Sequence, residues 1–255
     1  MTQYKKIAKA YTSKERMENP LRKFIIYPSW LGACGDVKGK TVLDLGCGGG
    51  GSSRMLAIKG AAVIGVDKEP EMIKIAQRIE RKNPMGIKYV VADAEYLPEF
   101  QKKFDLITPA YLLHYATSKK ELKNYIENIA LNLKQGGKMA AINLNPEQPI
   151  LSYNSSKAIF VSQKWQGKPF IEGSIIEVTL YKKNGAKICS FNCYFWQKQT
   201  YIDVMKGGGF SNIQWIKPRI NDIGKKVYAN WKRLKTRNLV IISATLNQRK
   251  RKGGK

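Results

Sequence analysis

Apolar residues in the first 150 positions fall into two alternating patterns. Stretches that are apolar almost throughout are typical of buried strands, and five of them lie at 40–47, 61–67, 87–94, 104–111 and 138–144. Between them, apolar residues recur every three or four positions, as on one face of a helix. After Pro70, for example, Met72, Ala76 and Ile79 have this spacing. Strands that alternate with helices through short connections predict a parallel sheet with helices on both of its faces.

Local signals also mark where these helices begin and end. Pro70 suits the first position of a helix, and Gly60 closes a short helical stretch over 52–60. Ser118 followed by Glu121 forms a capping-box pattern, which predicts the start of another helix. The pair Gly136–Gly137 predicts where that helix ends.

The pattern changes after residue 149. Two β-rich runs within 171–196 surround Asn184-Gly185, a pair that favours a β-hairpin. A helix over 200–207 and strands within 212–218 and 239–246 then return to the earlier pattern. We therefore expect an antiparallel β insertion that covers the open ends of the parallel strands. The expected organisation is an N-terminal helical cap (1–36), a core (37–149), the insertion (150–197), the rest of the core (198–246) and a basic tail (247–255).

Composition excludes several classes of protein. Hydrophobic residues make up 43% of the 255 positions, so the chain can bury a core and wholesale disorder is excluded. No apolar run approaches the roughly 20 residues that cross a bilayer, and the N-terminus has no apolar signal-peptide region. The four cysteines and single histidine fit neither a disulfide framework nor a zinc pattern. We expect reduced thiols, no metal, no membrane association and a cytoplasmic location.

The formal charge of +26 is distributed unevenly. Residues 41–110 contain ten Lys/Arg and nine Asp/Glu, whereas residues 217–255 contain thirteen Lys/Arg and a single acid, Asp222. Such a basic region can bind nucleic acid. It is equally explained as a solvated surface of a lysine-rich chain without any binding role, and the sequence leaves both interpretations open.

A glycine-rich loop follows the first predicted strand. Gly46, Gly48 and Gly51 have the G-x-G-x-x-G spacing between a strand and a helix, which taken alone suits NAD as well as other adenosyl ligands. Asp44, two residues before the first glycine, changes the balance, because a carboxylate there would repel a pyrophosphate at the helix N-terminus. S-adenosylmethionine (SAM) has no phosphate and carries a sulfonium and an ammonium, so an acid near the loop suits it.

Two more acids stand at the ends of the next two predicted strands. Asp67 is placed to accept hydrogen bonds from ribose hydroxyls. Asp93 is placed to accept from the adenine amino group, and the backbone N–H of Ala94 to donate to a ring nitrogen. Since the carboxyl ends of parallel strands share one edge of a sheet, where ligands bind in such folds, we expect Asp44, Asp67 and Asp93 to converge on one cleft.

The runs VLDLGCGGG (42–50), VIGVDKEPEMI (63–73), VVADAEYLP (90–98) and FDLITPAYLLHYA (104–116) together resemble the class I SAM-dependent methyltransferases. More narrowly, YKKIAKAYTSKE (4–15) and LKQGGKMAAINLNP (133–146) look like the small-molecule N-methyltransferases typified by the toxoflavin-biosynthesis enzyme. The resemblance implies a Rossmann-like, mostly parallel seven-stranded sheet and SAM as cofactor. It implies cofactor contacts from Tyr4 and Tyr11 on the N-terminal helix. The predicted cofactor-binding positions are Asp44, Gly46, Cys47, Gly48, Asp67, Lys68, Asp93, Ala94, Tyr4 and Tyr11.

Residues after the fourth strand are candidates for contacts with the methyl acceptor. His114 is the first candidate for a general base, and Tyr111 and Tyr115 flank it. Tyr11 is a second candidate for a catalytic role. A half-buried structural histidine and core aromatics are the alternatives. Trp165, Phe195, Trp196 and Trp215 suit stacking on a planar substrate or a core position equally. Thr108-Pro109-Ala110-Tyr111 departs from the Asn/Asp-Pro-Pro-Tyr/Phe pattern of base-modifying methyltransferases, so we regard that match as accidental.

Three functions remain open on these grounds. The leading interpretation is methyl transfer to a small, planar, nitrogen-containing metabolite in a closed pocket. The second is an RNA methyltransferase that uses Lys225, Lys226, Lys232, Arg233 and Arg237 as a phosphate track, and the third is a SAM-binding module without catalysis. The oligomeric state is not indicated by the sequence.

Overall fold

The computed structural model describes residues 19–148, 161–181, 185–227 and 238–247. Tyr4, Tyr11, most of the predicted N-terminal cap and the basic tail after Asn247 lie outside these residues. The predicted domain boundaries at 36, 149 and 197 stay predictions.

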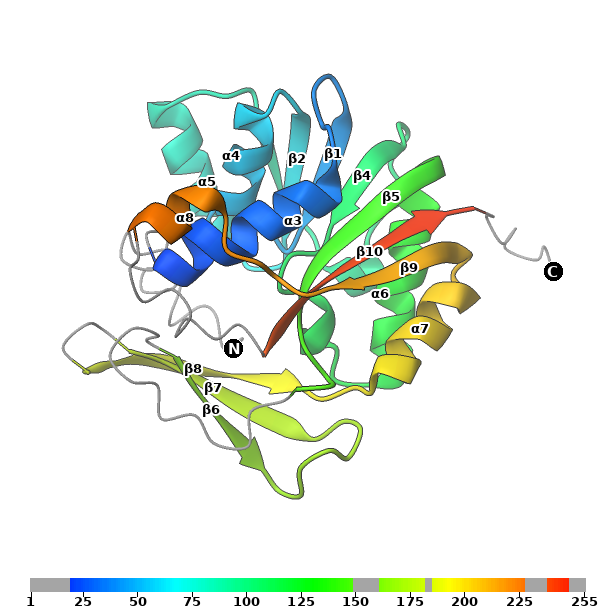
Figure 1. Ribbon diagram of the computed structural model, residues 1–255. Coiled ribbons are helices and arrows are strands. Elements are labelled where there is room, and N and C mark those ends of the chain that lie inside the picture. The colour runs from blue at the N-terminus through cyan, green and yellow to red at the C-terminus, as the bar shows by residue number, and fades with distance from the viewer. Residues whose placement is uncertain (1–18, 149–160, 182–184, 228–237, 248–255) are drawn as a thin grey trace.

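A seven-stranded sheet forms the centre of the fold, with strand order β3-β2-β1-β4-β5-β10-β9 (Figure 1). β1 is parallel to β2 and β4, β2 to β3 and β4 to β5, whereas β10 is antiparallel to both of its neighbours. The strands are β1 (Thr41–Leu45), β2 (Ala62–Asp67), β3 (Lys88–Val91), β4 (Phe104–Thr108), β5 (Leu133–Leu144), β9 (Phe210–Ile216) and β10 (Leu239–Leu246). The predicted α/β fold with a mostly parallel seven-stranded sheet is confirmed.

Helices cover both faces of this sheet (Figure 1). Alternate residues of β1 show why, since Val42 belongs to the apolar core on one face, and Leu43 and Leu45 belong to the core on the other. The first core lies under α3 (Tyr27–Cys34), α4 (Gly51–Ile58) and α5 (Pro70–Lys82), and the second under α6 (Lys119–Asn132) and α7 (Lys198–Gly207). The shorter helical segments are η1 (Arg22–Ile26, π-helical), η2 (Ala94–Tyr96), η3 (Leu113–Tyr115) and α8 (Asp222–Val227).

A second, three-stranded sheet consists of β6 (Val161–Gln166), β7 (Ile175–Tyr181) and β8 (Lys187–Tyr194), all antiparallel. The predicted antiparallel β insertion is therefore present. Its inner face carries a core of its own, including Ile176, Val178 and Phe191, against which Tyr115 and Leu144 of the main domain pack. This contact places the small sheet beside the loop that follows β4.

The end of α6 differs from its prediction. The helix ends at Asn132 and β5 begins at Leu133, ahead of the glycine pair that was expected to separate them. The Asn132 side chain accepts a hydrogen bond from the Phe100 N–H and donates to the Pro98 carbonyl, and Leu133 pairs with Phe104 of β4. Pairing with a distant strand thus decides this boundary, ahead of the local glycine signal.

Candidate active site

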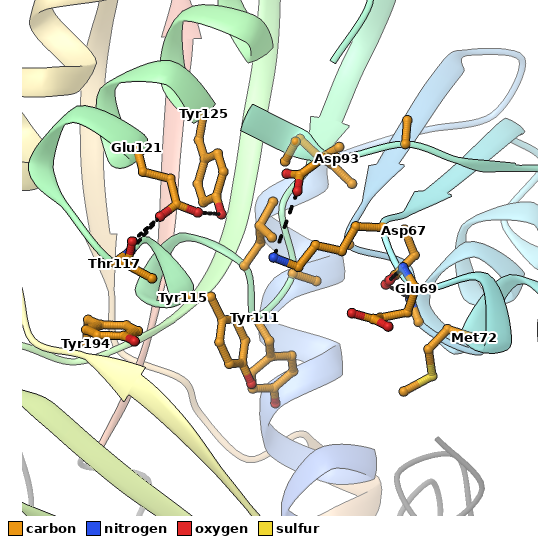
Figure 2. A pocket seen from close by; sticks show the side chains of 18 of the residues that line it. Asp67, Glu69, Met72, Asp93, Tyr111, Tyr115, Thr117, Glu121, Tyr125 and Tyr194 are labelled. Atoms are coloured by element: carbon orange, nitrogen blue, oxygen red, sulfur yellow. Dashed lines mark hydrogen bonds and ion pairs between the residues drawn. The ribbon is translucent and has the colours of Figure 1, made fainter. Parts of the chain in front are cut away.

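A cavity of about 380 Å³ opens at the carboxyl ends of the first four parallel strands (Figure 2). The loops after β1, β2, β3 and β4 form most of its wall, and α6 and β8 complete it. Its lining residues are Leu45, Gly46, Gly48, Asp67, Lys68, Glu69, Met72, Ala92, Asp93, Ala94, Ala110, Tyr111, Leu112, Tyr115, Thr117, Glu121, Tyr125, Asn192 and Tyr194. This is the edge at which open α/β sheets bind their ligands.

The glycine loop forms the floor of the cavity after β1. Gly46 and Gly48 have φ values of 76° and 54°, a region that residues with a side chain rarely adopt. The N–H groups of Gly46 and Cys47 both donate to the Val66 carbonyl, at 2.7 and 2.9 Å, which ties the loop to β2. A Cβ atom at Gly48 would have no neighbour within 4 Å. The backbone at Gly48 is therefore bare, and a ligand can approach it closely.

Asp67 stands at the end of β2 and holds the loop in place. Its Oδ2 accepts the Gly48 N–H at 2.8 Å and its Oδ1 accepts the Glu69 N–H at 2.9 Å. Burial raises the pKa of Asp67, against the opposing effect of these two hydrogen bonds. Because each carboxylate oxygen has more than one lone pair, Asp67 can still accept hydrogen bonds from a ligand in the cavity that it lines.

Asp93 follows β3, the strand next to β2, and lines the same cavity as Asp67 (Figure 2). Its Oδ1 accepts the Glu95 N–H at 2.9 Å, and its Oδ2 lies 3.9 Å from Nζ of Lys68. Ala94 and Lys68 line the same cavity. The structure thus brings together Asp67, Lys68, Asp93 and Ala94, four of the predicted cofactor-binding residues.

Asp44 does not join them, and the prediction that it faces the cleft needs correction. Its side chain is fully buried. Oδ2 accepts hydrogen bonds from the Ser52 and Ser53 hydroxyls, both at 2.6 Å, and Oδ1 accepts one from Thr108 at 3.1 Å. The start of α4 covers this carboxylate, so Asp44 joins α4 to β1 and β4 beneath the loop. Burial raises its pKa. The same contact gives Thr108 a structural role.

Cys47 is also displaced from the large cavity. Its thiol is buried against Gly65, where an added Cβ would lie 3.1 Å from Sγ, and burial raises its pKa. Cys47 lines a neighbouring hollow of about 180 Å³, which is formed by residues of the glycine loop together with Arg22, Tyr27 and Tyr111. The side chain of Cys47 therefore supports the loop from a side that the large cavity does not reach.

Arg22 is a site residue that the sequence analysis did not identify. Its guanidinium carbon lies 4.9 Å from the centre of the Tyr111 ring, and Nη1 donates to the Tyr27 hydroxyl at 3.2 Å. Arg22 opens the π-helical segment η1, a conformation that is common at functional sites. With 45 Lys and Arg in the chain, no local signal distinguished this one.

His114 faces a second, smaller cavity of about 90 Å³ between the main sheet and the three-stranded sheet. Tyr111 and Tyr115 line both this cavity and the large one. His114 is 2% exposed, and its Nδ1 lies 2.9 Å from Oδ1 of Asn143. Burial lowers the pKa of His114 to about 4, so the ring is neutral near pH 7. The predicted acceptor-side residues Tyr111, His114 and Tyr115 are thus neighbours.

Tyr111 has an unusual backbone, with φ at 62°. Its N–H donates to the Ile142 carbonyl of β5 at 2.8 Å, which holds the loop after β4 against the sheet. Non-glycine residues in this region cost roughly 1 kcal/mol or more and often lie at functional sites. With this backbone conformation, Tyr111 lines both the large cavity and the smaller one.

Among the charged side chains of the large cavity, acids outnumber bases. The four carboxylates are those of Asp67, Glu69, Asp93 and Glu121, and Lys68 is the single basic side chain among the described residues of its wall. Burial raises the pKa of Glu121, but hydrogen bonds from Thr117 and Tyr125 outweigh it and lower the pKa overall. The charged side chains of this cavity are therefore mainly acidic, although the chain has a net charge of +26.

The aromatic residues considered for stacking lie elsewhere among the described residues. Trp165 and Phe195 pack with Phe170 on the small sheet, with ring centres 5.4 to 6.1 Å apart. Trp196 donates its indole N–H to the Ala116 carbonyl, and Trp215 packs against the core of the main domain. None of the predicted four lines the cavity of about 380 Å³ or that of about 90 Å³.

Sequence comparison relates the part of the chain that contains this site to known proteins. Residues 42–137 match the methyltransferase domain family. The chain is 38% identical over 109 residues to a ubiquinone biosynthesis O-methyltransferase of Coxiella burnetii (strain Dugway 5J108-111), covering 43% of this chain and 45% of that relative. It is 31% identical over 137 residues to one of Pseudomonas putida (strain GB-1), covering 52% and 56%. The chain thus spans about half the length of these curated relatives.

Solved structures share the fold over nearly the whole chain. A SAM-dependent methyltransferase from Clostridium acetobutylicum ATCC 824 superposes with a TM-score of 0.63 at 18% identity, over 97% of this chain and all of that one. A SAM-bound amino pentose methyltransferase from Micromonospora echinaspora gives 0.62 at 15% identity, over 96% and 98%. The chain therefore shares the fold of these two methyltransferases, and within that fold residues 42–137 match the methyltransferase domain family.

The cavity of about 380 Å³ suits SAM by its own chemistry. The bare backbone at Gly48 permits close approach, and the carboxylates of Asp67 and Asp93 both line the wall. SAM brings hydrogen-bond donors and positive charge, which match acceptor groups of this kind.

A separate finding concerns membranes: no helix among the described residues combines the length and apolar character needed to cross one.

Proposed function

We propose that the chain transfers a methyl group from SAM to a small, planar, nitrogen-containing acceptor. One observation carries this proposal, namely that four carboxylates and one lysine line the large cavity of a strongly basic protein. Opposite charge favours a buried cation, and like charge repels an anion. A pyrophosphate would meet these carboxylates, whereas the sulfonium and ammonium of SAM are stabilised by them.

Each part of SAM has candidate partners in this wall. Asp67 accepts from the ribose hydroxyls, Asp93 Oδ2 accepts from the adenine amino group, and the Ala94 N–H donates to the ring. The backbone of Gly46 and Gly48 lies along the methionyl part. Lys68 borders the adenosine side.

Arg22 suits the carboxylate of the methionyl part. It lies beside the glycine loop, in the hollow of about 180 Å³ that this loop borders, and a guanidinium binds a carboxylate through paired hydrogen bonds. The predicted contacts from Tyr4 and Tyr11, and a catalytic role for Tyr11, rest on the family resemblance alone, since both residues lie outside the described part of the chain. Cys47 contributes through its backbone.

The chemistry depends on alignment. SAM, when bound, supplies an electrophilic methyl group on sulfur. The protein's part is to hold the acceptor in line with that group and to keep water away. Tyr111 and Tyr115 are suited to this because they line the large cavity and the smaller one that contains His114.

The class of acceptor atom rests on two different likenesses. The resemblance to toxoflavin-type N-methyltransferases favours nitrogen, whereas the two relatives above are O-methyltransferases of ubiquinone biosynthesis. A screen for the acceptor should therefore contain planar heterocycles with N–H groups and phenols in equal number.

RNA methylation is the second candidate. Its support is the basic C-terminal region. Part of that region, α8, packs on η1, and the Asn221 N–H just before α8 donates to the Phe24 carbonyl at 2.9 Å. Lys225 and Lys226 belong to α8, but neither lines the large or the smaller cavity. The remaining predicted track residues, Lys232, Arg233 and Arg237, lie outside the described residues.

The test is calorimetric titration with SAM and with S-adenosylhomocysteine, followed by transfer of labelled methyl to the acceptor screen and to bulk RNA. We expect saturable binding of both ligands, at least a tenfold loss for Asp67→Ala, and no change for Asp203→Ala on the exposed side of α7. Removing a buried hydrogen-bond partner costs about 1.5 kcal/mol or more of binding free energy, which corresponds to a tenfold or larger loss of affinity. Lack of SAM binding would refute the proposal, and label found only in RNA would favour the second candidate.

A further inference from the structure

The smaller cavity differs in chemistry from the one that suits SAM. Its wall is mainly apolar and includes Leu21, Ile26, Leu144, Val178, Leu180 and Phe191. No carboxylate occurs among the described residues that line it, and Arg22 is the charged group there. The small β-sheet supplies one side and the loop after β4 the other. Such a wall favours an apolar, uncharged ligand, because burying a charge without a partner costs free energy.

His114 lines this cavity, and one of its two ring nitrogens contacts Asn143. The Asn143 Nδ2 donates to the Leu144 carbonyl at 3.0 Å, which fixes the amide so that its Oδ1 faces Nδ1 of His114 at 2.9 Å. An oxygen there requires the proton on Nδ1. The Leu144 N–H also points at Nδ1, at 3.4 Å, a contact that would need the lone pair on Nδ1; the contact with Asn143 is 0.5 Å shorter and sets the tautomer. The neutral ring therefore carries its lone pair on Nε2, for which the described residues provide no hydrogen-bond donor.

We propose that the smaller cavity binds the methyl acceptor, and that this acceptor is an uncharged planar molecule whose hydroxyl or ring N–H group donates a hydrogen bond to Nε2 of His114. This inference rests on the proposed function and specifies its substrate class. It excludes cationic amines. Tyr111 and Tyr115, which line both cavities, then stand beside the acceptor and the methyl donor.

The hydrogen bond also accounts for the acceptor's proton. A new bond forms between the acceptor atom and the methyl carbon, the carbon–sulfur bond breaks with its electrons left on sulfur, and the acceptor's proton moves to Nε2 and then to water. Although burial lowers the pKa of His114 to about 4, a methylated oxonium is a far stronger acid than an imidazolium with that pKa. The other titratable groups facing the cavity are Arg22, Tyr111, Tyr115 and Cys193. Burial raises the pKa of the Cys193 thiol, so it stays protonated.

His114 is the single histidine of the chain, so its ring nitrogens can be observed by ¹⁵N NMR without assignment. The probes are phenol, toluene and benzylamine, the last a cation at pH 7, each added to the protein with S-adenosylhomocysteine. We expect phenol to shift the Nε2 resonance as a hydrogen bond forms, toluene to leave it nearly unchanged, and benzylamine not to bind. Phenol should bind roughly fivefold more tightly than toluene, the value of one net hydrogen bond.

Two variants distinguish a hydrogen bond at the position of Nδ1 from one at the position of Nε2. The His114→Asn side chain reaches only the position of Nδ1, and the His114→Gln amide reaches that of Nε2. We expect His114→Asn to bind phenol no better than toluene, and His114→Gln to retain most of the preference, with SAM affinity within twofold of wild type in both. If SAM binds but phenol leaves Nε2 unmoved, or benzylamine binds as well as phenol, this inference is wrong while the proposed function stands. Loss of SAM binding in the wild type would refute both.

Discussion

Asp44 and Asp67 show how two carboxylates at neighbouring strand ends acquire different tasks. Asp67 lines the cavity and accepts backbone N–H groups. Asp44 is fully buried and accepts three hydroxyl groups, from Ser52, Ser53 and Thr108. Its contribution to the site is therefore indirect, because it holds the start of α4 where the glycine loop needs it.

Replacing Asp44 tests this structural role. Asp44→Ala leaves three hydroxyls without their acceptor, and buried polar groups that lose a partner cost about 1–3 kcal/mol each. We expect the free energy of unfolding, measured with urea, to fall by about 3 kcal/mol, and Asp44→Asn to lose less because its amide oxygen still accepts. Exposed Asp203→Ala serves as the control with no change. A fully stable Asp44→Ala protein that fails to bind SAM would show instead that Asp44 acts on the ligand directly.

His114 makes stability depend on pH. Burial lowers its pKa to about 4 in the folded protein, against about 6.5 in an unfolded chain. Between these values the unfolded chain binds the proton and the folded one does not, so stability falls as the pH falls through this range. From pH 7 to pH 5 we expect a loss of about 2 kcal/mol from this residue.

The measurement compares wild type with His114→Gln by urea unfolding at both pH values. Other groups titrate in both proteins, so the difference between their pH dependences isolates His114. Equal dependences would mean that the ring titrates normally and is reached by water.

At the scale of elements, the glycine loop and the strands beneath it form one unit. Gly50 precedes α4 with φ at 84°, and an added Cβ would lie within 3 Å of two atoms of the Tyr89 side chain. Gly65 of β2 faces the same ring. The loop can therefore approach β2 only because these positions have no side chain.

Gly50→Ala should consequently destabilise the loop. Both the left-handed backbone and the contact with Tyr89 oppose a methyl group, and the expected loss is about 2–4 kcal/mol of unfolding free energy. Gly32→Ala is the matched control, since no atom lies within 4 Å of a Cβ there and alanine favours a helix by up to about 1 kcal/mol. Thermal unfolding of the two variants with and without SAM measures both effects. A Gly50→Ala protein as stable as wild type would contradict the close packing of Tyr89.

The sequence predicted most of the helices and strands, but it did not predict all of their ends. Pro70 begins α5 as expected, and the Ser118 hydroxyl accepts the Glu121 N–H as its capping-box pattern predicts. The end of α6 was wrong because Leu133 pairs with a strand that is distant in sequence, which no local pattern reports.

At the scale of the whole molecule, the distribution of charge matters more than its sum. The chain has a net charge of +26, but the described lining of the large cavity has four acids and one lysine. Charges inside a cavity are screened by salt much less than charges on a surface. The two proposed functions therefore differ in their response to ionic strength.

SAM affinity should change by less than about threefold between 50 and 500 mM NaCl, because its partners are sheltered from salt. Binding of single-stranded RNA through the basic region would instead fall steeply, with a slope of about −0.7 in log–log form for each phosphate contacted. Fluorescence titration of the same protein preparation with both ligands makes the comparison. A steep salt dependence for SAM would place its contacts on the exposed surface.

The sequence by itself determined the alternation of strands and helices, the glycine loop, and the acids at the ends of β2 and β3, because each depends on spacing between residues close in the chain. Tertiary structure alone decided that Asp44 turns beneath α4, that Arg22 reaches the loop, and that His114 faces a cavity closed by the small sheet. Those outcomes depend on segments that are distant in sequence, whose packing sets the direction and solvent access of each side chain. Local patterns contain no information about that packing.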